Sequence, residues 1–192
     1  MVKKMAINKN IPNILTLSRL LLVPVFIVFI FLHSIEARII FLILFIYASI
    51  TDFLDGYLAR RYDLKSNFGR VFDPIADKAL VLVIFVVILV KNFEYSIYIS
   101  VPILIMILRE LLISGIREAL AGDNIKIISS GLGKYKTAVQ MVCLGCLILA
   151  GKENLFLVIT QWLGISLTYL ATILSVLSAV YYIKQVYRKL LI

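Results

Sequence analysis

Four aspartates stand close together at the ends of two apolar runs. Asp52 and Asp55 are three residues apart in ITDFLDGYLARR, and Asp73 and Asp77 are four apart in GRVFDPIADKAL. These spacings put both members of a pair on one face of a helix. Crowded carboxylates repel one another unless divalent cations neutralise them. Oxygen ligands without histidine or thiolate suit Mg²⁺ or Mn²⁺, and two such ions can clamp a phosphoryl group.

The residues between the aspartates suit a phosphate-bearing ligand. Gly56 and Ala59 remove side-chain bulk beside the first pair, and Gly69 does the same before the second. Arg60 can fork onto phosphate oxygens. A solvated helix end, with the first aspartates paired to Arg60 and Arg61, would explain one pair alone. Two helically spaced pairs with small residues in register favour a functional site, as ionisable groups in membrane segments generally do.

The elements that must position these residues are membrane helices. The chain of 192 residues is 62% hydrophobic and 16% charged, with a mean hydropathy of +1.02, whereas soluble domains have roughly a quarter of their residues charged. Because about 20 apolar residues cross the hydrocarbon core, we expect an all-α integral membrane protein with one domain over residues 1–192. Its six transmembrane helices are expected at about 13–33, 38–59, 68–90, 96–119, 134–150 and 155–183.

The distribution of positive charge predicts the topology. With the N-terminus inside, most lysines and arginines fall on the cytoplasmic side, and only Arg38, Lys91 and Lys152 fall at the opposite ends. This positive-inside pattern predicts that both termini are cytoplasmic in the cell membrane. The net charge of +9 therefore indicates topology and anionic lipid headgroups, not nucleic acid. The four aspartates would lie at adjacent cytoplasmic helix ends.

The cysteines and the histidine argue against other chemistries. Cys143 and Cys146 form a C-x-x-C inside an apolar run, and His33 is the only histidine. Zinc would need further ligands, so both cysteines are expected to pack as small apolar groups. A mechanism with paired histidines is excluded by composition.

The aspartates and their neighbours resemble the signature of the CDP-alcohol phosphotransferase family. The pattern D-x2-D-G-x2-A-R-x8-G-x3-D-x3-D runs from Asp52 to Asp77, with eight fixed positions over 26 residues. The resemblance implies a six-helix membrane bundle, usually a homodimer, with two Mg²⁺ or Mn²⁺ ions at a site open to the cytoplasm. Members of this family use an alcohol hydroxyl to displace CMP from a CDP-linked donor.

The resemblance also implies residue roles. Asp52, Asp55 and Asp73 would ligate metal, and Asp77 would ligate the second metal and act as general base in a direct in-line attack. The CDP-linked donor would contact Gly56, Arg60 and Ser66, with Ala59 and Gly69 beside them.

Three further stretches resemble the family members that join CDP-diacylglycerol to glycerol 3-phosphate: NIPNILTLSRLLLVPVF, LRELLISGIRE and GKYKTAVQM. In the first, Asn13, Thr16 and Arg19 recur every three residues and share a helical face. By analogy this face reaches the nucleotide or its diphosphate.

A phosphorylated acceptor needs additional cations. The cytoplasmic ends of the expected fourth and fifth helices carry Arg109, Arg117, Lys134 and Lys136, which are candidates to bind the phosphate of glycerol 3-phosphate. Simple positive-inside anchoring is the competing interpretation. Inositol phosphate would need the same cations, whereas serine would not, and phosphatidylglycerol is a further alternative acceptor.

Two other classes of membrane protein use acidic helices. An intramembrane prenyltransferase also binds a diphosphate through aspartates and Mg²⁺, but eight or nine helices would be expected. A cation transporter would place its carboxylates near the middle of the bilayer, whereas here they gather at one end of two helices.

Overall fold

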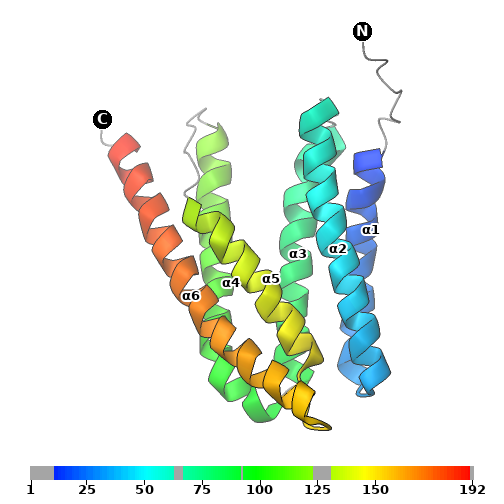
Figure 1. The fold of residues 1–192 in the computed structure, drawn as a ribbon. Coiled ribbons are helices and arrows are strands. Elements are labelled where there is room, and N and C mark those ends of the chain that lie inside the picture. The colour runs from blue at the N-terminus through cyan, green and yellow to red at the C-terminus, as the bar shows by residue number, and fades with distance from the viewer. Residues whose placement is uncertain (1–10, 63–66, 92, 123–130, 191–192) are drawn as a thin grey trace. The chain divides into compact units, whose positions relative to one another are not determined.

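Six helices make up the part of the chain that the computed structural model describes, namely residues 11–62, 67–91, 93–122 and 131–190. Figure 1 shows them in chain order. They are α1 (Ile11–Val28), continued by the 3₁₀ turn η1 (Phe29–Phe31), then α2 (Ile35–Tyr62), α3 (Asn67–Lys91), α4 (Phe93–Gly122), α5 (Gly131–Leu149) and α6 (Leu155–Leu190). Each of the six predicted segments is a helix, with ends within a few residues of the prediction except at the longer C-terminal end of α6.

Four of the described helices are long and apolar enough to cross a membrane. They contain the spans Asn13–Phe31, Ile35–Leu54, Ser96–Leu120 and Leu155–Lys189. Large apolar side chains such as Ile97 and Leu112 are 73% and 63% exposed, as expected of residues that face lipid. The protein is therefore an integral membrane protein. Helix α3 contains Asp73 and Asp77 in its first half. Helix α5 contains Lys134 and Lys136 near its start.

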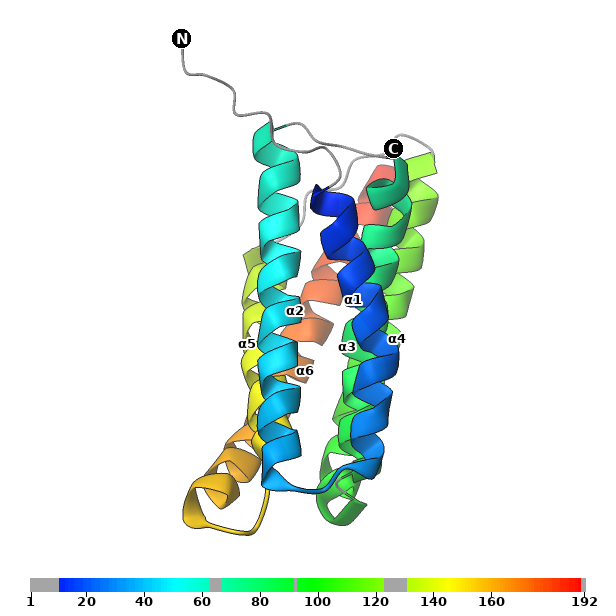
Figure 2. The ribbon, with the colours of Figure 1, turned by 90° about the vertical axis from the view of Figure 1, so that its right-hand side faces the viewer.

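The helices fall into two compact units, residues 1–87 and 88–192. In the first unit, α1 turns through η1 into α2, and both views show the two helices side by side (Figures 1 and 2). The centroid of the Phe41 ring lies 5.0 Å from that of the Phe26 ring and 4.8 Å from that of the Phe29 ring. The backbone N–H of Ala37 donates to the Ser34 hydroxyl at 3.2 Å, which caps the start of α2. This hairpin holds α1 antiparallel to α2.

In the second unit, α6 packs against α5 and α4. A Cβ atom at Gly164 would lie 2.7 Å from Cδ2 of Leu147, so the close approach of α5 and α6 requires glycine at this position. The Cys143 thiol is buried, 3.1 Å from the Thr168 hydroxyl. Both cysteines are free thiols, and the buried position of Cys143 agrees with the predicted packing role.

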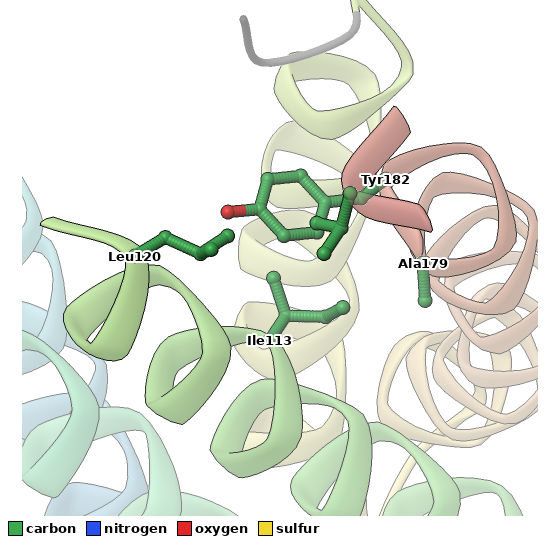
Figure 3. Close-up of a cluster of buried hydrophobic side chains, with 5 residues drawn as sticks. Ile113, Leu120, Ala179 and Tyr182 are labelled. Carbon is green, nitrogen blue, oxygen red and sulfur yellow. The ribbon is translucent and has the colours of Figure 1, made fainter. Parts of the chain in front are cut away.

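The α4–α6 contact is mainly apolar near the C-terminal ends of these helices. Figure 3 shows Ile113 and Leu120 of α4 facing Ala179 and Tyr182 of α6. All four side chains are less than a tenth exposed. This cluster anchors the end of α6 to α4 and thereby sets the position of the polar residues one or two turns earlier on the same helices.

Candidate functional site

Arg19 joins three of the four predicted aspartates. It lies on α1 with 1% of its side chain exposed, and its Nη1 donates to Oδ1 of Asp52 on α2 and Oδ1 of Asp77 on α3. Its Nη2 lies 3.8 Å from Oδ1 of Asp73. Three helices of the first unit thus converge on one guanidinium. We call Thr16, Arg19, Asp52, Asp73 and Asp77 the Arg19 cluster.

Thr16 completes the contact between α1 and α3. It is fully buried, and its hydroxyl donates to Oδ1 of Asp73. Thr16 and Arg19 are three residues apart, so the helical face predicted to reach the nucleotide is the face that meets the aspartates. On another face of α1, the apolar side chains of Leu17 and Leu21 are 48% and 63% exposed. The amphipathic pattern of α1 therefore directs its polar stripe into the cluster.

The three carboxylates stay accessible although their cation is buried. The side chains of Asp52, Asp73 and Asp77 are 47%, 37% and 43% exposed. A buried guanidinium beneath half-exposed carboxylates leaves carboxylate surface available to a ligand. Because ions are most strongly attracted where carboxylates outnumber their counter-ions, the cluster suits a cationic ligand on its exposed side.

The carboxylate oxygens of the Arg19 cluster are of the type that divalent cations bind. Carboxylate oxygens are the hard ligands that Mg²⁺ and Mn²⁺ prefer, and three of them share a single guanidinium here. Among the described side chains, however, no three acidic, histidine or cysteine groups are arranged closely enough to hold a metal ion. The side chain of Asp55 lies outside the described part. The family resemblance, not the arrangement of the other three aspartates, therefore carries the metal prediction.

Several predicted donor contacts lie outside the described side chains. Helix α2 runs through Asp55, Gly56, Ala59 and Arg60, but only its backbone is described there, and Ser66 lies outside the described residues. Gly69 is buried in the first turn of α3. Asn13 is half-buried on the same face of α1 as Thr16. The contacts of these residues with a CDP-linked donor stay predictions.

A second polar cluster lies in the second unit. The Arg109 Nε donates to the backbone oxygen of Ser175 at 3.1 Å, and Nη2 donates to the Ser178 hydroxyl at 3.0 Å. The Glu110 carboxylate lies 3.4 Å from Nη1 of Arg109 and also pairs with Lys136, which is 4% exposed. One carboxylate of α4 therefore joins two cations, and α6 holds the arginine in place. We call these five residues the Arg109 cluster.

The four cations predicted to bind the acceptor phosphate separate into two groups. Arg109 and Lys136 are together in the Arg109 cluster. Lys134 is exposed, and the exposed Arg117 lies with its guanidinium carbon 5.9 Å from the centre of the Tyr182 ring, a cation–π contact. Positive-inside anchoring at the membrane surface therefore explains the exposed Arg117 and Lys134 well. It explains Arg109 and Lys136 less well, because they are only 13% and 4% exposed.

The sequence-based prediction missed Ser175 of this cluster and Gln140, which neighbours it on α5. Gln140 follows Lys136 by one helical turn and is 3% exposed, and Ser175 on α6 is fully buried. The spacing of Lys136 and Gln140 in GKYKTAVQM was a usable signal, because residues four apart share a helical face. No comparable signal marked Ser175, which is brought to Arg109 only by the packing of α6.

Residues 9–183 match the CDP-alcohol phosphatidyltransferase family, and the chain belongs to this family. The matched region contains both polar clusters. The individual relatives carry one name. A CDP-diacylglycerol–glycerol-3-phosphate 3-phosphatidyltransferase of Rickettsia prowazekii is 39% identical over 181 residues, which are 94% of this chain and 97% of the relative.

Two other relatives with the same name show similar agreement. The protein of Wigglesworthia glossinidia brevipalpis is 39% identical over 183 residues, covering 94% of this chain and 97% of the relative. The protein of Haemophilus influenzae is 38% identical over 177 residues, covering 91% and 92%. The similarity is therefore to nearly complete proteins and extends well beyond the aspartate motif.

Proposed function

We propose that the protein transfers the phosphatidyl group of CDP-diacylglycerol to sn-glycerol 3-phosphate, forming phosphatidylglycerophosphate and releasing CMP. The observation that carries this proposal is the convergence of α1, α2 and α3 on the Arg19 cluster. It supplies carboxylates and a guanidinium where a diphosphate and its cations would need them. The names of relatives at 38–39% identity over more than nine-tenths of the chain support the choice of donor and acceptor.

Two Mg²⁺ or Mn²⁺ ions are the cofactors that the family resemblance implies. Asp52, Asp55, Asp73 and Asp77 would hold them. Bound there, the ions would offset the charge that develops on the diphosphate when CMP leaves. The described carboxylates contribute accessible oxygens, and Thr16 contributes orientation because its hydroxyl bond restrains the Asp73 carboxylate.

Asp77 is the proposed general base. The attacking hydroxyl of the acceptor must lose its proton, and a carboxylate takes it efficiently only when it is held in position. The bond from Arg19 restrains one oxygen of Asp77, and the other oxygen is the candidate to accept the proton. The hydroxyl then attacks phosphorus in line, the bond to CMP breaks, and no covalent enzyme intermediate forms.

The donor is held by the residues around the aspartates. Arg19 and Arg60 offer guanidinium groups to phosphate oxygens. The remaining donor contacts in the proposal are Asn13, Thr16, Gly56, Ala59, Ser66 and Gly69. Small residues beside the carboxylates allow a nucleotide to approach the backbone of α2 and α3.

The acceptor phosphate is bound by cations of the second unit. Arg109 and Lys136 are the main candidates because they are only 13% and 4% exposed and share a single carboxylate, Glu110. A phosphate dianion would therefore meet two cations that are only partly neutralised. Arg117 and Lys134 are assigned to the same role as outer contacts that attract the anion.

The proposed architecture is a single domain in the cell membrane. All six helices cross the bilayer, both termini are cytoplasmic, and the reaction takes place on the cytoplasmic side. The excess of lysine and arginine on that side supports this topology. The proposed assembly is a homodimer, as the family resemblance implies.

Release of CMP tests the proposed reaction. Purified full-length protein in lipid nanodiscs receives CDP-diacylglycerol, Mg²⁺ and one acceptor at a time. We expect CMP with glycerol 3-phosphate and little with serine, inositol phosphate or phosphatidylglycerol. CMP release with one of these and none with glycerol 3-phosphate would overturn the acceptor, and no release with any acceptor would overturn the activity.

A further inference from the structure

Two buried polar atoms, one within the Arg109 cluster and one on a residue adjacent to it along α5, have no hydrogen-bond partner among the residues that the structure describes. They are Oε1 of Gln140 on α5 and the hydroxyl oxygen of Ser175 on α6. The two residues are 3% and 0% exposed. Buried polar atoms are nearly always paired in native proteins, so two such atoms in one region need an explanation.

Each atom belongs to a residue that neighbours a cation-bearing residue of the cluster. Gln140 is four residues after Lys136, so the two side chains occupy the same face of α5. Ser175 accepts a hydrogen bond from Arg109 through its backbone oxygen. Helices α5 and α6 run antiparallel and are in contact here, since a Cβ atom on Gly133 would lie 3.8 Å from the Ser178 hydroxyl. Two cations and two unused hydrogen-bonding groups therefore belong to one polar region of α4, α5 and α6.

This combination matches the chemistry of a phosphorylated polyol. Glycerol 3-phosphate has a phosphate at one end, the attacking primary hydroxyl at the other, and a C2 hydroxyl that the reaction does not consume. When that hydroxyl leaves water, it needs a protein group that accepts its hydrogen bond. An amide oxygen next to the phosphate-binding cations can supply it, whereas lysine and arginine cannot, because they only donate.

We propose that Gln140 recognises the C2 hydroxyl of glycerol 3-phosphate by accepting a hydrogen bond through Oε1, and that the Ser175 hydroxyl donates to the acceptor's phosphate. This inference rests on the proposed function and deepens it by naming the groups that select the acceptor. Gln140 makes the enzyme prefer a polyol phosphate to a phosphate with a plain alkyl chain. Ser175 contributes to anion binding without distinguishing the two.

The test compares two acceptors that differ only at C2. Glycerol 3-phosphate carries the hydroxyl and 3-hydroxypropyl phosphate lacks it, while both keep the phosphate and the attacking hydroxyl. A site built to pair with a hydroxyl rejects an analogue without it strongly. We expect kcat/KM of the wild-type protein to favour glycerol 3-phosphate by at least about 100-fold.

Gln140→Leu is expected to reduce that preference to less than about fivefold, with the loss falling on glycerol 3-phosphate and the KM for CDP-diacylglycerol unchanged. Gln140→Met provides a second apolar replacement of similar length if the leucine variant does not fold. Gln161→Leu is the matched control, since Gln161 is also buried but lies near the start of α6. This control should keep the wild-type preference.

Ser175→Ala is expected to raise KM for both acceptors by the same factor, about fivefold or more. Ser166→Ala, which removes a hydroxyl bonded only to its own helix at Trp162, is the control and should leave both values unchanged. A change in the preference between acceptors would contradict the role assigned to Ser175.

The outcomes separate this inference from the proposed function. Two results would overturn the inference but leave the proposed reaction intact. One is a wild-type kcat/KM that is nearly the same for glycerol 3-phosphate and 3-hydroxypropyl phosphate. The other is an equal loss of kcat/KM for both substrates in the Gln140 variants. That second result would mean that Gln140 only supports packing. Absence of turnover with glycerol 3-phosphate in the wild-type protein would overturn the proposed function, and the inference with it.

Discussion

One nitrogen of Arg19 on α1 bonds both Asp77 on α3 and Asp52 on α2. The guanidinium is buried, whereas the two carboxylates are nearly half exposed. A residue of α1 thus holds Asp77, the proposed base, close to Asp52, a proposed metal ligand. A movement of α1 would therefore shift both carboxylates together, so in the proposed reaction the first helix would help to position the reacting groups.

Asp77→Asn should leave the fold intact and nearly abolish turnover. The amide keeps the shape of the carboxylate but cannot take the proton of the acceptor hydroxyl, so kcat is expected to fall by about 10²–10⁴-fold. CMP release at saturating substrates measures the effect, with thermal unfolding as the check on folding. Glu118→Gln, which removes an exposed charge on α4 that bonds Ser114, is the control. Near wild-type turnover in Asp77→Asn would refute the role as base.

Arg19→Gln should bind divalent cations more tightly and the nucleotide more weakly. The guanidinium competes with any other cation for the Oδ1 atoms of Asp52 and Asp77, so its removal raises the affinity for Mn²⁺, by about tenfold or 1.4 kcal/mol. The same change removes a proposed phosphate contact and weakens binding of CDP. Titration of Mn²⁺ followed by electron paramagnetic resonance, and calorimetry with CDP, measure the two effects without turnover.

The exposed Arg188 near the end of α6 supplies the control for this pair of measurements, because Arg188→Gln makes the same chemical change away from the cluster. It should leave both affinities at the wild-type value. Weaker Mn²⁺ binding in Arg19→Gln would show that Arg19 mainly organises the aspartates and does not compete with cations.

Glu110→Gln should destabilise the second unit. Removal of the carboxylate leaves Arg109 and the buried Lys136 without their shared partner. Breaking a fully buried ion pair costs about 3–5 kcal/mol, and the loss here should be smaller because the Glu110 side chain is 30% exposed. The melting temperature should fall, and glycerol 3-phosphate should raise it more in the variant than in the wild-type protein, because an anion replaces the lost charge. Glu110→Asp should recover part of the loss. Equal stabilisation of both proteins by the ligand would argue against anion binding at this cluster.

Gly164→Ala should lower stability through the α5–α6 contact. The new Cβ atom would meet the Leu147 side chain at 2.7 Å, and overpacking of this kind costs about 1–3 kcal/mol. Gly115→Ala on α4 is the matched control with the opposite expected sign, since nothing lies within 4 Å of its new atom and alanine is the better helix former by about 1 kcal/mol. Melting temperatures of the two variants in one detergent decide the comparison, and a stable Gly164→Ala would mean that α5 and α6 can separate locally.

The helices and the aspartate motif were predictable because their signals are local. Long apolar runs require helices in a membrane, since unpaired backbone groups are too costly in lipid. Spacings of three and four placed Asp73 with Asp77, and Thr16 with Arg19, on common faces. The confirmed helices follow from the apolar runs, and the polar face of α1 follows from the spacing of its polar residues.

The contacts between helices were not predictable from periodicity. The spacing of Thr16 and Arg19 predicted which helical face Arg19 occupies but not its partner, because Asp52, Asp73 and Asp77 were equally suitable carboxylates. Among Arg109, Arg117, Lys134 and Lys136, the sequence set apart only Arg109, which lies inside a predicted span. It did not pair Arg109 with Lys136, as the structure does through Glu110. Gln140 was overlooked because its spacing from Lys136 predicts a shared helical face but not that this face is buried.

The sequence by itself determined that this chain is a helical membrane protein with acidic pairs suited to cations and phosphate. Tertiary structure alone decided that Arg19 bridges Asp52 and Asp77, and that Glu110 holds Arg109 near Lys136. The physical reason is that helical faces follow from spacing along one segment. Partners across segments depend on how side chains of several helices fill the space between them, which no single segment encodes.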